Sequence, residues 1–207
     1  MNNHHHEVLR KGAQQLSLEI SDKKIDQLLC FAGLILKWNK THNLTAITNP
    51  DEIVSKHLLD SLSVCSSFPE GRVLDVGSGA GLPGIPLSVV NTTQEFTLVD
   101  SSLKRIAFIR EVKRELALTN ITAIHSRVED YNDGFFDVIT SRAFSSLETM
   151  LQQTKNLLTD NGCWFAMKGT LPTEEINNID SAFTVQKTTK LLVPGLNAER
   201  HIVEIKR

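Results

Sequence analysis

The sequence predicts an α/β fold, in which a mostly parallel sheet with an antiparallel C-terminal end follows a helical N-terminal extension. From residue 69 onwards, short apolar segments alternate with amphipathic ones, which is typical of βαβ units with helices on both faces of a sheet. Residues 1–68 show only the apolar spacing of helices. We therefore expect an extension over 1–68 and a sheet domain over 69–207, which together form one compact unit.

The extension is predicted to contain two amphipathic helices. The first begins at Ser21-Asp22 and ends near Trp38-Asn39. The second begins at Asn49-Pro50-Asp51, where a polar cap precedes a proline, and continues to Cys65. In both, apolar residues recur at the three- and four-residue steps of one buried face: Ile25, Leu28, Leu29, Ala32, Ile35 and Leu36 in the first, and Val54, Leu58, Leu62 and Cys65 in the second.

The sheet domain is predicted to begin with five parallel strands separated by helices. We place the strands at 73–76, 96–99, 121–124, 136–139 and 163–167, and the helices at 84–90, 102–116 and 147–158. Two further strands, at 183–192 and 200–206, are joined through Pro194-Gly195-Leu196-Asn197. This hairpin forms the antiparallel end of the sheet.

Charge and cysteine content exclude several classes of protein. With 22 basic and 24 acidic residues, any binding of nucleic acid must depend on a local basic patch. We find no run of about 18 apolar residues and no apolar segment typical of a secretory signal. The three cysteines match no zinc or disulfide pattern and are expected in the core. We expect a cytoplasmic protein without a membrane segment or a metal.

A glycine-rich segment from Leu74 to Gly84 lies between the first predicted strand and the first helix of the sheet domain. In an open α/β sheet this turn lies in the crevice at the carboxyl ends of the strands, where ligands bind. Asp100 ends the next strand, 23 residues after Gly77. A carboxylate at that position can accept hydrogen bonds from the hydroxyls of a ribose. The two features together predict a cofactor that contains adenosine.

Residues within the glycine-rich segment indicate which cofactor this is. Gly79-x-Gly81-x-x-Gly84 matches the dinucleotide pattern, so an NAD-dependent oxidoreductase is an alternative. However, Asp75 would repel a pyrophosphate but suits an ammonium group, and Pro83 lacks the N–H that a pyrophosphate needs. S-adenosylmethionine fits better. Asp75 and the loop from Gly77 to Gly81 would hold its methionine end, and Asp100 its ribose.

The loop after the third predicted strand is a candidate for the adenine end of the cofactor. It reads His125-Ser126-Arg127-Val128-Glu129. We expect the backbone of Val128 and Glu129, together with the Glu129 carboxylate, to contact the adenine edge. A carboxylate that faces only solvent is the alternative interpretation of Glu129.

At these residues the sequence resembles a known family. The run from Asp75 to Leu87 is similar to the signature of the bacterial 16S rRNA guanine-N7 methyltransferases, also called the glucose-inhibited division protein B family. The likeness keeps its order and spacing from about Trp38 to Gly169. The other matching segments are Asn43–Ile47, His57–Leu62, Val99–Ser101 with Lys104-Arg105, Ser141–Phe144 and Lys168-Gly169.

The resemblance implies a class I S-adenosylmethionine-dependent methyltransferase fold, which is Rossmann-like. It implies methylation of N7 of one guanine in the 530 loop of 16S rRNA, with cofactor contacts from Gly77, Leu82, Val128, Glu129 and Arg142. Guanine N7 carries a lone pair and no proton, so the reaction requires no general base and depends on positioning and electrostatics. The expected partner is 16S rRNA or the small ribosomal subunit, and we expect a monomer.

Five basic residues are further candidates on the substrate side. Arg142, at the end of the fourth strand, could bind the methionine carboxylate, a phosphate, or a carboxylate of the protein itself. Lys168, at the end of the fifth strand, could contact a phosphate, a base edge or only solvent. Lys104, Arg105 and Arg200 would add positive charge for RNA.

His57 and Asp60 lie one helical turn apart on the second helix of the extension, so they are expected to pair. The pair would either cover the cofactor site and contact substrate, or have a structural role in the core. Two other functions remain open besides the oxidoreductase. They are a methyltransferase that acts on a substrate other than RNA, and a non-catalytic ribosome-assembly factor that binds the cofactor.

Overall fold

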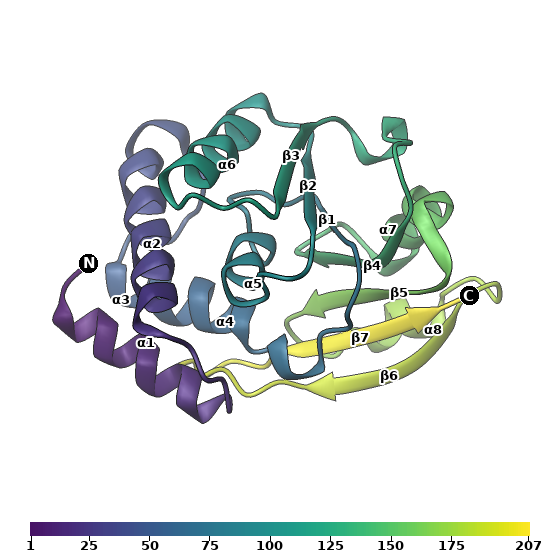
Figure 1. Ribbon diagram of the computed structural model, residues 1–207. Coiled ribbons are helices and arrows are strands. Elements are labelled where there is room, and N and C mark those ends of the chain that lie inside the picture. The colour runs from purple at the N-terminus through teal and green to yellow at the C-terminus, as the bar shows by residue number, and fades with distance from the viewer.

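The computed structural model describes all residues from Met1 to Arg207, and its centre is a seven-stranded sheet with the order β3-β2-β1-β4-β5-β7-β6 (Figure 1). Strands β1 to β5 run parallel, and β7 is antiparallel to both β5 and β6. This confirms the predicted mixed sheet. The strands are β1 (Val73–Val76), β2 (Phe96–Asp100), β3 (Ile121–His125), β4 (Phe136–Arg142), β5 (Leu158–Lys168), β6 (Thr184–Lys190) and β7 (His201–Lys206).

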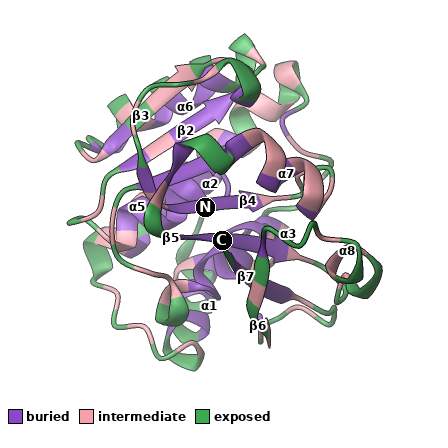
Figure 2. Cartoon of the chain, turned by 90° about the vertical axis from the view of Figure 1, so that its right-hand side faces the viewer, coloured by how far each residue is buried: buried purple, intermediate pink, exposed green.

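Helices cover both faces of the sheet because successive strand residues point to opposite sides. In β1, Val73 packs with the helices of one face and Leu74 with those of the other, and Val138 and Ile139 alternate in the same way in β4. Buried residues follow the central strands, while exposed residues lie on loops and outer helix faces (Figure 2). One face carries α1 (Asn3–Gln15), α2 (Asp22–His42), α5 (Gly84–Val90) and α6 (Leu103–Glu115), and the other carries α7 (Leu147–Thr154).

The helical extension packs directly on the sheet domain. Phe31 of α2 stacks on Phe108 of α6 with 6.3 Å between ring centroids, and both side chains are fully buried. Helix α2 continues to His42, beyond the predicted end near Trp38. None of the helices combines the length and apolar composition needed to cross a lipid bilayer.

Helix α1 was not predicted, because its sequence is polar and begins with three histidines. Its first turn is closed by a reciprocal pair of hydrogen bonds between Asn2 and His5. Leu9 is fully buried, and Gly12 lies so close to Leu59 that a Cβ would stand 2.6 Å from that side chain. The helix is therefore stabilised by a cap and by tertiary contacts that periodicity alone did not reveal.

The predicted second helix of the extension is interrupted by a π-helical segment. It consists of α3 (Pro50–Ile53), the π-helical η1 (Val54–Leu59) and α4 (Asp60–Leu62). Val54, Leu58 and Leu62 are fully buried as expected. A π-helical turn inserts one residue into a helix and is frequent at functional sites, which draws attention to the residues that η1 presents.

The C-terminal part contains two further differences from the prediction. Strand β5 begins at Leu158 rather than at residue 163, since α7 ends at Thr154 and is followed by a 3₁₀ turn, η4 (Lys155–Leu157). A short helix, α8 (Thr173–Asn177), follows β5 and was not predicted. Both predicted C-terminal strands are confirmed, although each is shorter than expected.

Candidate functional site

A cavity of about 300 Å³ opens at the carboxyl ends of β1, β2, β3 and β4. It lies beside the point where the strand order reverses, between β1 and β4, which is where open α/β sheets bind ligands. The cavity is lined by Gly77, Val99, Asp100, Ser101, Arg105, Ser126, Arg127, Val128, Glu129, Phe144 and Gln153. A wider cavity of about 730 Å³ lies between α1 and α2, away from the strand ends.

The glycine loop reaches the cavity through Gly77, whose backbone lines it. Gly77, Gly79 and Gly81 all have positive φ, at 64°, 58° and 81°. A Cβ on Gly77 would stand 3.1 Å from the ring of Phe144, and one on Gly81 would stand 2.5 Å from Ile85. The positions of Gly77 and Gly81 therefore favour glycine both for the conformation and for space, and that of Gly79 for the conformation alone.

Asp100 is held at the end of β2 by three hydrogen bonds and is almost fully buried. Its Oδ2 accepts from the backbone N–H of Gly79 at 2.9 Å and from Nη1 of Arg105 at 3.3 Å, and its Oδ1 accepts from the N–H of Ser102 at 2.8 Å. Asp100 therefore links the glycine loop to the start of α6 and presents a carboxylate at the cavity, where a ribose was expected.

Asp75 is fully buried beneath the glycine loop and does not line the cavity. Its Oδ2 accepts from the N–H of Gly84 at 2.9 Å, whereas its Oδ1 has no hydrogen-bond partner in the protein. Burial raises the pKa of Asp75 to about 7, against the lowering effects of the Gly84 hydrogen bond and of the charge on Arg142. An unpartnered buried acceptor fits a ligand that brings its own donor, such as an ammonium group.

The residues expected near adenine form a single turn, η3 (Val128–Asp130), at the cavity. Val128 is buried, while Glu129 is exposed and forms an ion pair with Arg127 at 3.3 Å. The resemblance also implied a cofactor contact from Leu82 in the glycine loop, but Leu82 is buried in the core. Val128 and Glu129 thus line the cavity, whereas Leu82 does not.

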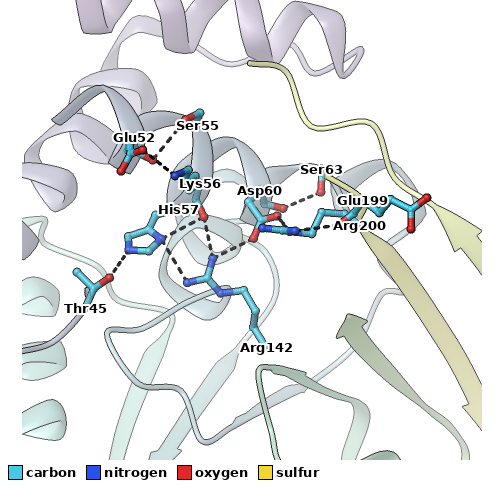
Figure 3. Close-up of polar contacts among 10 residues, drawn as sticks. All are labelled: Thr45, Glu52, Ser55, Lys56, His57, Asp60, Ser63, Arg142, Glu199 and Arg200. Carbon is cyan, nitrogen blue, oxygen red and sulfur yellow. Dashed lines mark hydrogen bonds and ion pairs between the residues drawn. The ribbon is translucent and has the colours of Figure 1, made fainter. Parts of the chain in front are cut away.

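Figure 3 shows a second polar cluster, in which one buried carboxylate binds two arginines from distant parts of the chain. Nη1 of Arg142 lies 3.0 Å from Oδ2 of Asp60, and Nε of Arg200 lies 2.6 Å from Oδ1. Nη1 of Arg142 also donates to the carbonyl of Lys56 in η1 at 3.1 Å. The two guanidinium groups are partly exposed, and together with one carboxylate they carry one net positive charge.

His57 belongs to this cluster but does not form the predicted pair with Asp60. Its Nε2 lies 2.9 Å from the hydroxyl of Thr45, and its Nδ1 lies 3.4 Å from Nη2 of Arg142. The π-helical segment places Arg142 between the two residues, which corrects the expectation of a direct contact. Burial, and next the charge of Arg142, lower the pKa of His57 to about 4, so the ring is neutral near pH 7.

The remaining basic candidates differ in their ion pairs and in their exposure to solvent. Lys168 forms an ion pair with Glu175 of α8 at 2.8 Å and is mostly buried, so it is neither solvated nor free. Lys104 and Arg105 begin α6 and are exposed. Of these three, only Arg105 lines the cavity.

The structure also corrects one expectation about the cysteines and adds residues to the site. Cys30 is exposed on α2 rather than buried in the core, whereas Cys163 is buried as expected. Phe144 and Gln153 line the cavity, although neither was predicted as a site residue. Gln153 lies in an amphipathic helix, where a glutamine is usually solvated, so the sequence carried no signal for it. No group of three or more His, Cys, Asp or Glu side chains is arranged to hold a metal.

Comparison with known sequences finds relatives along almost the whole chain. The family model described as rRNA small subunit methyltransferase G matches residues 24–203. A protein named ribosomal RNA small subunit methyltransferase G from Ectopseudomonas mendocina is 46% identical, over 98% of this chain and 96% of the relative. One of the same name from Haemophilus influenzae is 45% identical, over 93% of this chain and 95% of the relative.

Solved structures with the same fold are methyltransferases. An S-adenosylmethionine-dependent methyltransferase from Aquifex aeolicus aligns with a TM-score of 0.57 and 19% identity, over 76% of this chain and 93% of that one. The glycopeptide N-methyltransferase MtfA, solved with S-adenosylmethionine, aligns with a TM-score of 0.63 and 12% identity, over 72% and 94%. At these identities the likeness shows the fold, which is that of class I methyltransferases.

Proposed function

Because the chain belongs to the rRNA small subunit methyltransferase G family, we propose that it methylates N7 of a guanine in the 530 loop of 16S rRNA. The observation that carries this proposal is the family match over residues 24–203, which includes both the cavity and the cluster of Asp60 and Arg142. The specific atom and loop come from the resemblance of the segment Asp75–Leu87 to the guanine-N7 enzymes.

The residues present fit S-adenosylmethionine, the cofactor of this family. A close backbone wall at Gly77, a carboxylate at Asp100 and an unpartnered acceptor on Asp75 match backbone, ribose and ammonium contacts. When bound, S-adenosylmethionine supplies an electrophilic methyl group. We assign Asp75 and the loop Gly77–Gly81 to the methionine end, with Asp75 acting from beneath the loop.

The adenosine end is assigned to the opposite side of the cavity. Asp100 would accept hydrogen bonds from the ribose, and Val128 and Glu129 would contact adenine. Because Arg105 already binds the Asp100 carboxylate, it would limit the rotation of the acid that receives the ribose. Arg142, whose charge reaches Asp75, is assigned to the methionine carboxylate.

Methylation of a lone-pair nitrogen leaves the protein with the tasks of binding, orientation and exclusion of water. Accordingly, the proposal requires no residue to remove a proton. His57, neutral and hydrogen-bonded to Thr45, would act by holding Arg142 in place. Asp60, with both oxygens bound to arginines, would act by positioning these groups rather than by contacting RNA.

On the RNA side we assign Arg200, Lys104 and Arg105 to the phosphates or base edges of the target, whereas Lys168, which is paired with Glu175, would hold α8 in place. Lys104 and Arg105 follow β2, and Arg200 precedes β7, at the same edge of the sheet as the cavity. Such a local group of basic residues can bind RNA although the net charge of the chain is −2. We further propose that the enzyme is a cytoplasmic monomer that needs no metal, and that the division at residue 69 separates two parts of one folding unit.

The proposal is tested with labelled S-adenosylmethionine and small ribosomal subunits from cells that lack the gene. After incubation, the RNA is digested and the labelled nucleoside is identified by chromatography and mass. We expect 7-methylguanosine at one site in the 530 loop. An Asp100→Ala variant is the control and should lose about 1–3 kcal/mol of cofactor binding, measured by calorimetry.

Two results would contradict the proposal. Label in a nucleoside other than 7-methylguanosine would show that the enzyme methylates a different atom. Cofactor binding without any label in RNA, in naked 16S rRNA as well as in subunits, would favour another substrate or a non-catalytic assembly factor.

A further inference from the structure

Gln153 is a polar side chain of the cavity that has no role in the assignments made so far. It lies on α7 and is half-buried, and it lines the same cavity as Asp100 and Val128. Helix α7 packs against η3, so Gln153 and Val128 lie at the same end of the cavity. This is the end assigned above to adenine.

The carboxamide of Gln153 makes no hydrogen bond with the rest of the protein, although its neighbour does. Gln152 donates to Glu148 at 2.9 Å and accepts from Lys155 at 2.8 Å, and so uses both ends of its amide on the outer surface of α7. Gln153 thus brings an unused donor and an unused acceptor to the cavity.

A carboxamide is complementary to adenine. Its oxygen accepts from the exocyclic amino group, and its NH₂ group donates to the adjacent ring nitrogen. Asp100 and Glu129, the two acids that line the cavity, accept hydrogen bonds but cannot donate them as carboxylates, so neither offers this combination of donor and acceptor. Phe144, which closes the cavity above Gly77, supplies an apolar surface but no polar group.

We propose that Gln153 is a specificity-determining residue that recognises the adenine of the cofactor through its carboxamide. This inference rests on the use of S-adenosylmethionine proposed above. Gln153 takes no part in the transfer of the methyl group. Its contribution is to favour an adenine nucleoside over one whose base lacks the amino group.

The test compares two ligands and two variants by calorimetry. The ligands are S-adenosylhomocysteine and its deamino analogue, in which purine replaces adenine. The variants are Gln153→Met and the matched control Gln152→Met, both of which keep the side-chain length and the helix propensity. Unmodified protein should prefer the adenine ligand by about three- to tenfold, the scale of one or two neutral hydrogen bonds.

In Gln153→Met we expect this preference to fall at least about threefold, because only the ligand that carries the amino group loses a hydrogen bond. Gln152→Met should keep the preference of the unmodified protein. A merely structural role of Gln153 would weaken both ligands equally and leave their ratio unchanged, which would overturn the inference. If the unmodified protein did not bind S-adenosylhomocysteine, the proposed function would fail first, and the role of Gln153 with it.

Discussion

The buried carboxylate of Asp75 leads to the prediction that one substitution increases stability while it weakens cofactor binding. Burial raises its pKa to about 7 from the ordinary value of 3.8. A shift of about three units corresponds to about 4 kcal/mol between the two protonation states. Because the folded state holds a proton that the unfolded chain has lost, the free energy of unfolding falls as the pH rises from about 4 to about 7, and stays low above it.

The substitution Asp75→Asn removes this charge but keeps the shape of the side chain. At pH 8 it should recover up to about 4 kcal/mol, less about 1–3 kcal/mol because the new NH₂ group has no partner. We therefore expect a net gain of about 1–3 kcal/mol at pH 8, shrinking towards zero at pH 5 where the carboxyl is already protonated. Urea unfolding at the two pH values measures both quantities.

Asp100→Asn is the matched control, since that carboxylate accepts three hydrogen bonds and its loss should destabilise the protein at pH 8. The predicted effect on cofactor binding is tested by calorimetry with S-adenosylhomocysteine in two buffers of different ionisation enthalpy. Binding to unmodified protein near pH 6 should release a proton from Asp75, and Asp75→Asn should bind at least about tenfold more weakly. A variant less stable than its parent at pH 8, or equally changed at both pH values, would refute the reasoning.

Three further predictions concern the rest of the site. Asp60→Asn should lower the free energy of unfolding by about 3 kcal/mol in urea, because it leaves two arginines without their shared partner; an unchanged midpoint would show that the pairs contribute nothing. Gly81→Ala should lower both the melting temperature and the affinity for S-adenosylhomocysteine, while Gly33→Ala, with open space around its Cβ, should be neutral or stabilising; equal effects would contradict the role of the loop. Arg200→Met should raise KM for the ribosomal subunit without changing the affinity for S-adenosylhomocysteine, and the opposite pattern would move Arg200 to the cofactor.

The parts of the fold that were predictable depend on local patterns. Short apolar runs that alternate with amphipathic segments predicted the parallel strands, and the glycine loop with Asp100 predicted the ligand-binding edge. The unpredicted parts depend on contacts distant in sequence. The start of β5 is a polar run that resembles a turn and becomes a strand because Leu158 pairs with Phe136. Helix α1 is stabilised because Gly12 lies close against Leu59 of η1 and Leu9 belongs to the same hydrophobic core.

The candidate site also contains residues that the sequence predicts and residues whose contacts it does not predict. Residues that lie in one short motif, such as Gly77 and Val128, reach the predicted cavity. The predicted contact between His57 and Asp60 was wrong. Over a few residues a π-helical segment has the same apolar spacing as an α-helix, but its side chains point in different directions. That Asp60 would bind Arg200, 140 residues further along the chain, could not be inferred from spacing.

This cluster connects the helical extension to the end of β4 and to the segment before β7. Asp60 is supplied by the extension, Arg142 by the end of β4 and Arg200 by the segment before β7, so the arrangement exists only when all three are docked. A single buried carboxylate between two guanidinium groups is costly to form alone but stable once both are present. The extension therefore sets the position of both arginines. Substitutions where α1 packs on η1, such as at Gly12 against Leu59, should affect the position of Arg142, because η1 supplies the Lys56 carbonyl that accepts from Arg142.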